Sequence, residues 1–419
     1  MAVEGTMWKT ILEGGISSIM KRKISMPYWC VGNPVGDPFG PGVLNKISSL
    51  EVTDLLVEAR REGLIDFTAA HDCDLVPWDP VNNNDDQDES SSVFQTLKSI
   101  KEKLGKADIQ FKMISCNLHA DPVFRNGGIA NPDPRIRILA AQKVMRALRI
   151  GHFLGAEYFT YWVARDGFEC QFSVPWENTY RFLAEGLDLV SNYVQEENLG
   201  YRGGTVEYKP NEPRGESFLP TVGHSLALIS RLKRPDFWGV NPEVLQHDQM
   251  TGLTSVGAVA FAVAAGKLFF IHVGNQKPNQ FDNDNPPLIG MDGVKEFVSI
   301  LYILERMAWE GYVEFDNHPL RTDTAPGGEN RLNVRRDYIR LAVESYKAAE
   351  TKAEELAQDE KIQSAQRKIW ETDTQAEKAL GSGSLSEVDA YRCDYQSLVR
   401  ERLGIGELDL LIARRLFGQ

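Results

Sequence analysis

Short apolar runs alternate with longer amphipathic segments between about residue 28 and residue 318. The short runs predict strands at residues 28–32, 64–71, 111–117, 156–163, 203–209, 237–244, 267–274 and 311–318. The segments between them place apolar residues at i, i+3 and i+4, which is the spacing of a helix with one buried face. Eight strands, each followed by a helix, predict a (β/α)8 TIM barrel. A doubly wound open sheet is the alternative, but no glycine-rich phosphate loop follows an early strand.

The composition changes after Asn330, and residues 331–380 are rich in Ala, Glu, Lys and Arg and poor in Gly. This composition predicts helices. We therefore expect an N-terminal extension at residues 1–25, a catalytic barrel at residues 26–325 and a C-terminal helical arm at residues 326–419. Because the arm has no obvious core of its own, we expect it to wrap the barrel or a neighbouring subunit.

Charge and cysteine usage narrow the classes of function. The net charge is −13 and no basic stripe stands out, so we expect no nucleic-acid partner. The five cysteines are dispersed without a CxxC pair, which predicts reduced thiols in a cytoplasmic protein. No run of 18 apolar residues and no signal peptide is present, so we expect no membrane association.

Polar and aromatic residues gather at the C-terminal ends of the predicted strands. They are Trp29, His71, Asn117, Trp162, Glu207, Lys209, Glu243, His272 and Asp316. In (β/α)8 enzymes this end of the barrel carries the active site. The pattern therefore predicts an enzyme.

Four of these residues predict a cation site: Glu207, Glu243, His272 and Asp316. Hard divalent cations take carboxylate oxygens, and an imidazole shifts the preference toward transition metals. His247, Asp282 and Asp284 could build a second site that shares Glu243. Taken alone, an Asp-x-Asp pair in a loop is more typical of turn chemistry.

The other candidates each have two interpretations. His71 with Asp74 is either a base with an orienting carboxylate or a core histidine beside an acid. Trp29 and Trp162 either wall an apolar pocket or stack on a sugar face, or they pack in the core. Lys209 either polarises a substrate oxygen or neutralises buried charge.

Five sequence blocks resemble the D-xylose isomerases of the short, actinobacterial type. They are GDPFG (36–40), NLHADPVFRNGG (117–128), KPNEPRG (209–215), LPTVGHSLALISRLKRPDFWGVNPEV (219–244) and FDNHPLRT (315–322). The resemblance runs from about residue 26 to the C-terminus. It implies a sugar substrate, a 1,2-hydride shift between C1 and C2 that interconverts an aldose and a ketose, and one or two divalent metals. It also implies a homotetramer or homodimer with embracing C-terminal arms.

The resemblance assigns roles to individual residues. The metal ligands that it implies are Glu207, Glu243 and Asp316 at a first site and Glu243, His247, Asp282 and Asp284 at a second. Lys209 would hydrogen-bond the O1 atom of the sugar, and His71, oriented by Asp74, would assist ring opening. Trp29 and Trp162 would line the pocket, and Phe39 would reach into the pocket of a partner subunit.

The sequence departs from the family pattern at the site. His272 replaces an aspartate ligand, His119 a pocket phenylalanine and His318 a lysine. Glu243 and His247 are four residues apart where the family has three. We therefore expect Mn²⁺ or Co²⁺ to be favoured over Mg²⁺, and an altered substrate.

A set of Glu207, Glu243, His272 and Asp316 also resembles the single-metal site of the ketose 3-epimerases, which transfer a proton. An enzyme acting on another or modified sugar in that way is one alternative. A non-catalytic sugar-binding homologue is another.

Overall fold

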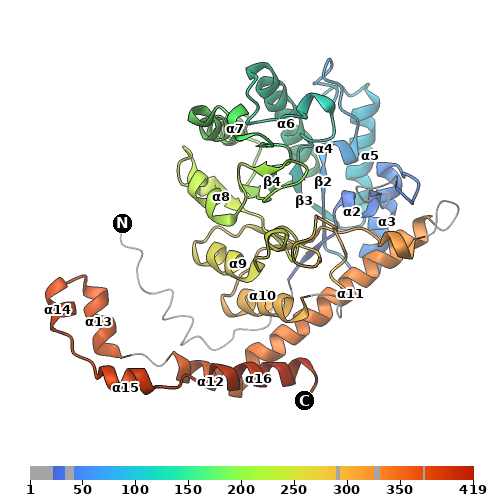
Figure 1. The fold of residues 1–419 in the computed structure, drawn as a ribbon. Helices are drawn as coiled ribbons and strands as arrows, with labels where there is room; N and C mark the ends of the chain where they lie inside the picture. The colour runs from blue at the N-terminus through green and yellow to red at the C-terminus, as the bar shows by residue number, and fades with distance from the viewer. Residues whose placement is uncertain (1–21, 34–41, 289–292, 325–330, 371–372) are drawn as a thin grey trace. The chain divides into compact units, whose positions relative to one another are not determined.

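Parallel strands form the centre of the larger of two compact units, and helices surround them (Figure 1). The computed structural model describes residues 22–33, 42–288, 293–324, 331–370 and 373–419. The larger unit spans Met20–Ala349, and the second contains Glu350–Gln419.

The central sheet closes on itself through a strand that is split in two. Its strands are β1 (Ile24–Ser25), β2 (Phe67–His71), β3 (Gln110–Ser115), β4 (Tyr158–Trp162), β6 (Gly203–Glu207), β8 (Trp238–Val240), β9 (Glu243–Val244), β10 (Phe270–Val273) and β11 (Tyr312–Phe315). They pair in parallel in the order β8-β6-β4-β3-β2-β1-β11-β10-β9.

Asn241 and Pro242 separate β8 from β9, and Pro242 has no N–H to donate to a sheet. Because β8 pairs with β6 while β9 pairs with β10, the two pieces act as one strand that completes the ring. A parallel bridge from Val240 to Leu268 joins the same edges. The predicted (β/α)8 barrel is confirmed.

Helices follow the strands and cover the outside of the barrel (Figure 1). They are α2 (Tyr28–Gly32), α3 (Ser49–Arg61), α4 (Asp72–Leu75), α5 (Ser92–Lys106), α6 (Pro134–Leu154), α7 (Trp176–Glu196), α8 (Val222–Ile229), α9 (Ser255–Ala264), α10 (Val294–Arg306) and the first part, up to Ala349, of α11 (Arg331–Gln358). Local sequence fixes their ends. Ser48 and Glu51 form a capping box at the start of α3, and Gly155 ends α6 with a φ of 98°.

The prediction of a strand at residues 28–32 is wrong. These residues form α2, and the first strand is Ile24–Ser25, just before Pro27. Tyr28, Cys30 and Val31 are all buried, and a short run that is apolar throughout does not distinguish a buried strand from a buried helix. Trp29 nevertheless follows the first strand directly.

A buried ion pair ties the end of β2 to α6. Lys143 Nζ lies 2.5 Å from Asp72 Oδ2, and the other oxygen of Asp72 accepts a hydrogen bond of 2.8 Å from the Asn117 backbone N–H. Asp72 is fully buried and Lys143 is 2% exposed. Through these two contacts Asp72 holds the segment that follows His71 against α6 and against the end of β3.

Short β5 (Gly167–Phe168) and β7 (Glu216–Ser217) pair antiparallel. They join the loop that follows β4 to the loop that follows β6. These loops carry Arg165 and Glu212.

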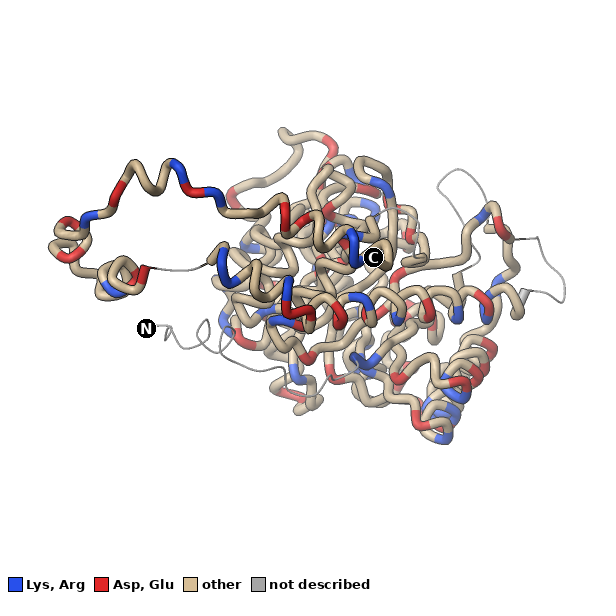
Figure 2. The backbone as a smooth tube through the Cα atoms, turned by 90° about the horizontal axis from the view of Figure 1, so that it is seen from below, with Lys and Arg blue, Asp and Glu red and all other residues tan. Residues whose placement is uncertain are grey.

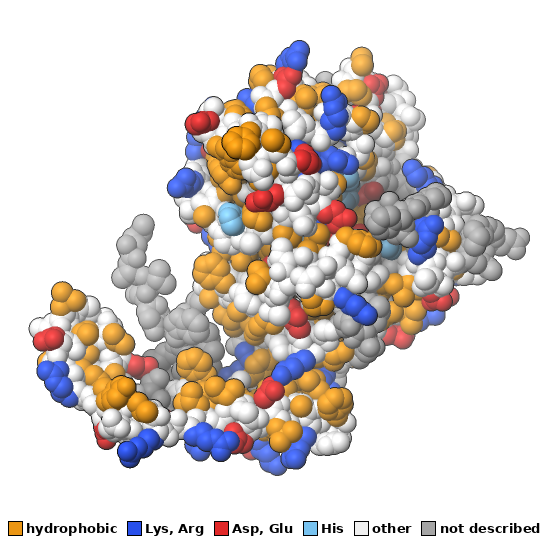
Figure 3. Space-filling model, viewed as in Figure 1, with side chains coloured by type: hydrophobic (Ala, Val, Ile, Leu, Met, Phe, Trp, Pro, Cys, Tyr) orange, Lys and Arg blue, Asp and Glu red, His pale blue; other side chains and the backbone are white. Residues whose placement is uncertain are grey.

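The second unit is helical, as predicted for the C-terminal arm. Beyond the end of α11 it contains α12 (Glu360–Ile369), α13 (Thr374–Ser382), α14 (Leu385–Ala390), α15 (Tyr395–Arg400) and α16 (Ile405–Leu416). Helices α12 and α16 pack together, and Arg415 Nε lies 2.7 Å from Asp359 Oδ2. Apolar side chains stay exposed on this unit (Figure 3), including Leu385 at 86% and Phe417 at 82%.

The predicted boundaries at residues 25 and 325 stay predictions. Residues 331–349 of α11 belong to the barrel unit and bury Val343 and Tyr346. Basic and acidic residues are intermixed along the chain (Figure 2). Among the described helices, none has the length and hydropathy needed to cross a bilayer.

Candidate active site and metal centre

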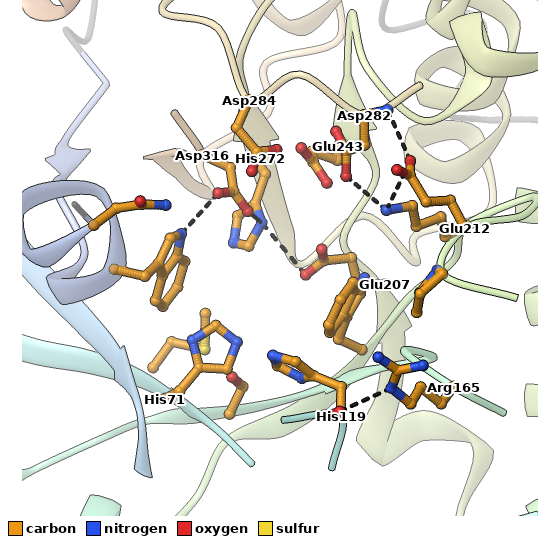
Figure 4. A pocket seen from close by; sticks show the side chains of 17 residues that line it. His71, His119, Arg165, Glu207, Glu212, Glu243, His272, Asp282, Asp284 and Asp316 are labelled. Carbon is orange, nitrogen blue, oxygen red and sulfur yellow. Dashed lines mark hydrogen bonds and ion pairs between the residues drawn. The ribbon is translucent and has the colours of Figure 1, made fainter. Parts of the chain in front are cut away.

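A cavity of about 400 Å³ lies at the C-terminal ends of the barrel strands (Figure 4). The predicted site residues that line it are Trp29, His71, His119, Trp162, Glu207, Lys209, Glu243, His272, Asp282, Asp284 and Asp316. Asp74, His247 and His318 do not line it, and Phe39 lies outside the described residues. The convergence follows from the fold, because parallel strands bring their C-terminal ends to one rim.

One group of ligand atoms joins β6, β10 and the end of β11. The ligand atoms of Glu207, His272 and Asp316 lie within 4.8 Å of one another. His272 Nδ1 is 3.3 Å from Glu207 Oε2 and 3.4 Å from Asp316 Oδ2. The other ring nitrogen, Nε2, is 2.9 Å from Glu314 Oε1.

Two further groups share residues with the first. Glu207, Glu243 and His247 form one, and Glu243, Asp284 and Asp316 form the other, again with ligand atoms within 4.8 Å. Glu243 therefore stands between Glu207 on one side and Asp284 on the other.

His247 reaches this cluster although it stands four residues after Glu243. Leu245 has a φ of +62°, a left-handed conformation that takes up the longer spacing. His247 Nδ1 lies 2.8 Å from the Tyr208 carbonyl oxygen, so in the neutral ring this nitrogen donates the proton. The Nε2 atom then faces Glu243 Oε2 at 2.6 Å.

The donor set fits a divalent cation. Four atoms that could ligate are buried and make no hydrogen bond: Glu243 Oε1, His247 Nε2, His272 Nδ1 and Asp282 Oδ1. Orphaned polar atoms of this kind are costly unless a ligand satisfies them. Carboxylate oxygens with neutral imidazoles suit Mn²⁺, Co²⁺ or Zn²⁺, and also Mg²⁺ where oxygens dominate.

The crowding of carboxylates is visible in their pKa values. Burial raises the pKa of Glu243 to about 8, against the opposing charge of His247 and with Asp282 and Asp316 adding to the rise. Burial and the neighbouring Asp282 raise the pKa of Asp284 well above its usual range. A bound cation would remove this penalty, since it replaces protons as the counter-charge.

Lys209 is held between two carboxylates at the edge of the cluster. Its Nζ lies 2.7 Å from Asp282 Oδ2 and 3.8 Å from Glu212 Oε2. Burial alone would lower the pKa of Lys209, but Asp282 outweighs it and raises the pKa above the ordinary value. The ammonium is therefore charged, and it lies 5.5 Å from the centre of the Trp162 ring.

His71 and Asp74 have the geometry of a base and its orienter. Asp74 Oδ2 accepts a hydrogen bond from the His71 backbone N–H at 2.8 Å and lies 3.2 Å from His71 Nδ1. Burial would lower the pKa of His71, but the Asp74 carboxylate raises it above the ordinary value. The ring lines the cavity, unlike that of a histidine enclosed in the core.

An aromatic row forms the wall opposite the carboxylates. The His119 ring meets the Trp162 ring edge to face at 4.7 Å and the His71 ring at 5.8 Å, and Trp29 lies 4.7 Å from His71. Burial, together with the charge of His71, lowers the pKa of His119 well below the ordinary value, so this ring is neutral. Trp29 Nε1 donates a hydrogen bond of 2.8 Å to Asp316 Oδ1.

His318 lies beside the cluster without facing the cavity. Its backbone N–H donates a hydrogen bond of 2.8 Å to the Asp284 carbonyl oxygen, and its ring Nδ1 is 3.2 Å from the Pro319 oxygen. Burial lowers its pKa.

Sequence reasoning missed several residues of the site. Glu212, Arg165, Asn33, Met113, Ser115 and Pro213 also line the cavity. Glu314 lies beneath it against His272, and its position two residues before Asp316 is a signal that strand alternation could have provided. Arg165 carried no such signal, because it lies in a loop and its Nε donates to the His119 carbonyl oxygen at 2.8 Å.

Comparisons with known proteins agree with this architecture. The chain is 33% identical to the xylose isomerase of Thermus thermophilus over 308 residues, which cover 73% of this chain and 75% of that protein. No family model matches the chain.

Among solved structures, L-ribulose 3-epimerase matches with a TM-score of 0.54 at 16% identity, covering 81% of this chain and 99% of that one. D-psicose 3-epimerase from Clostridium cellulolyticum, solved with D-tagatose, matches with a TM-score of 0.52 at 13% identity, covering 80% and 99%. At these identities the two structures support the barrel fold alone. The identity to the Thermus enzyme over nearly three quarters of the chain shows more: the chain belongs to the xylose isomerase family.

Proposed function

We propose that the protein is a metal-dependent sugar isomerase that interconverts an aldose and a ketose by a 1,2-hydride shift. The observation that carries the proposal is the set of buried ligand atoms without a hydrogen bond on Glu243, His272 and Asp282, three residues that line a cavity together with charged Lys209. Membership of the xylose isomerase family supports it, and we place the chain with the short type of that family.

Two sets of residues would hold the metals. Glu207, Glu243, His272 and Asp316 would form the first site, and Glu243, His247, Asp282 and Asp284 the second. A bound divalent cation supplies Lewis acidity for two neighbouring oxygens of the sugar.

The chain's own residues supply the remaining steps. Lys209 stabilises negative charge that develops on the substrate oxygen at C1, because its ammonium is fixed in place before the reaction. His71, with Asp74 fixing its ring, moves a proton at the ring oxygen during ring opening. Trp29, His119 and Trp162 enclose the sugar and exclude water.

Proton transfer is the second candidate, and His272 favours it. An imidazole at this position makes the first site similar in composition to that of the ketose 3-epimerases, and L-ribulose 3-epimerase shares the fold. In that case two carboxylates beside the metal would exchange a proton with the substrate carbon. A binding protein without turnover is the third candidate.

Hydrogen isotope exchange distinguishes these reactions. We expect the Mn²⁺-loaded protein to convert members of an aldose and ketose panel in deuterated water while the migrating hydrogen is retained, as followed by ¹H NMR. Deuterium at the reacting carbon would instead establish proton transfer. Sugar binding without turnover would identify a binding protein and overturn the proposal.

A variant at Lys209 tests its catalytic role. We expect Lys209→Met to lower kcat by about 10²–10³-fold, the usual cost of losing one preorganised donor at a developing oxyanion. Metal content and thermal unfolding should stay close to those of the wild type. If the variant unfolds while activity per folded molecule is unchanged, Lys209 only neutralises the charge of Asp282.

The imidazole of His272 predicts the metal preference. We expect stronger activation by Mn²⁺ or Co²⁺ than by Mg²⁺, because Mg²⁺ prefers oxygen ligands in octahedral geometry. The change His272→Asp should move the preference toward Mg²⁺. It must be combined with Glu314→Gln, since a carboxylate at position 272 would otherwise face the buried Glu314 carboxylate. The measurement is the ratio of activity with Mn²⁺ to activity with Mg²⁺ in a coupled assay. If this ratio is the same in the double variant as in the wild type, His272 is not a metal ligand.

The C-terminal helices are the proposed oligomerisation arm of a homotetramer or homodimer. Exposed apolar side chains on α14, α15 and α16, among them Leu385, Val399 and Ile405, are best explained by a partner subunit. We expect a chain that ends after Ala349 to form a smaller species in light scattering than the full chain. A monomeric full-length protein would contradict the proposal.

A further inference from the structure

Glu314 is a fully buried carboxylate beneath the proposed metal centre. It stands on β11 between β1 and β10, in register with Ser25 on one side and with His272 on the other. The three side chains therefore sit at one level on adjacent strands. Glu314 does not line the cavity, so it is not placed to touch a substrate.

Both oxygens of Glu314 are engaged. Ser25 Oγ donates a hydrogen bond of 2.5 Å to Oε2, and His272 Nε2 lies 2.9 Å from Oε1. Because a carboxylate only accepts, the proton in this second contact belongs to His272 Nε2. The serine hydroxyl holds the carboxylate so that its free oxygen faces the ring.

The opposite edge of the His272 ring faces the cavity. Its Nδ1 makes no hydrogen bond and lies between Glu207 Oε2 and Asp316 Oδ2. A neutral ring with its proton on Nε2 presents a lone pair at Nδ1 toward these two oxygens. That is the tautomer which can ligate a metal.

We propose that Glu314 is a positioning residue which fixes the ring orientation and tautomer of His272, so that Nδ1 binds a divalent cation together with Glu207 and Asp316. This inference rests on the proposed metal dependence and deepens it. Partners of this kind behind a ligating histidine contribute about 10–100-fold to metal affinity. Ser25 assists indirectly, by anchoring the carboxylate.

Mn²⁺ titration of the full chain, followed by electron paramagnetic resonance, tests the proposal. We expect Glu314→Gln to weaken binding at the first site by about 10–100-fold, because an amide can donate to Nε2 as well as accept from it and so no longer selects one tautomer. We expect Ser25→Ala to weaken binding by less. The matched control is Glu157→Gln, since Glu157 is a carboxylate just before β4, at the opposite end of the barrel, where it contacts Lys112 and Arg202. The Glu157→Gln variant should bind Mn²⁺ with the affinity of the wild type.

A spectroscopic measurement shows whether Glu314 fixes the His272 tautomer or only stabilises the fold. In the Zn²⁺-loaded wild type with ¹⁵N-labelled histidine, long-range ¹H–¹⁵N correlation spectra should show His272 protonated on Nε2 and metal-bound through Nδ1. The signals are assigned by their absence from the His272→Asp/Glu314→Gln double variant. A wild-type ring that is protonated on Nδ1 overturns the proposal, even where Glu314→Gln does not fold. Unchanged Mn²⁺ affinity in a folded Glu314→Gln variant overturns it as well.

These outcomes are independent of sugar turnover. If Mn²⁺ binding depends on Glu314 but no sugar is converted, the positioning role stands and the proposed isomerase activity fails. If sugar is converted equally well by the wild type and Glu314→Gln with equal Mn²⁺ affinity, the activity stands and the positioning role fails. A wild type that binds no Mn²⁺ overturns both.

Discussion

Mutual repulsion among buried and half-buried carboxylates is the constraint on which the candidate active site depends. Glu207, Glu243, Asp282, Asp284 and Asp316 line one cavity of about 400 Å³. Burial raises the pKa of Glu243 to about 8 even beside the opposing charge of His247, so the ionised carboxylate is disfavoured there. The barrel makes the arrangement possible, because its rim is held by closed strand pairing and does not need favourable contacts among the acids themselves. The strand pairing that stabilises the barrel therefore does not depend on the repulsive contacts among the acids at its rim.

The chain neutralises this charge unevenly. Burial would raise the pKa of Asp282, but Lys209, whose Nζ lies 2.7 Å from Asp282 Oδ2, and His247 lower it well below the usual range. Asp284 Oδ1 accepts a hydrogen bond of 3.1 Å from the neutral Gln246 amide, and burial and the neighbouring acids raise the pKa of Asp284. The pKa values of two carboxylates two residues apart are thus shifted in opposite directions, because the positive charges of Lys209 and His247 act on Asp282. The same ammonium lines the cavity, so charge balance and the proposed oxyanion stabilisation are compatible roles for Lys209.

The barrel and most residues at its rim could be predicted from sequence, because both follow from one regular pattern. Parallel strands with period-2 alternation place polar residues at a shared edge, and the cavity contains eleven of the fifteen predicted residues. Where the regularity ends, the prediction fails. Residues 28–32 are apolar throughout and form a helix, and the strand before them is only two residues long. Arg165 and Glu212 come from loops whose course depends on the β5–β7 pair, and no local pattern in the sequence reports that pairing.

His272 and Glu314 show why a substitution at the site has to be interpreted with its neighbours. Strand register places the two side chains next to each other on β10 and β11, and both are buried. An aspartate at position 272 would put a second carboxylate against Glu314, and two buried acids in contact cannot both ionise without a large penalty. An imidazole at position 272 avoids this repulsion, because its Nε2–H can donate a hydrogen bond to the Glu314 carboxylate. The acid at 314 therefore makes an imidazole the compatible side chain at 272, whether or not a metal binds there, and this buried neighbour accounts for the departure from the aspartate that the resemblance implies.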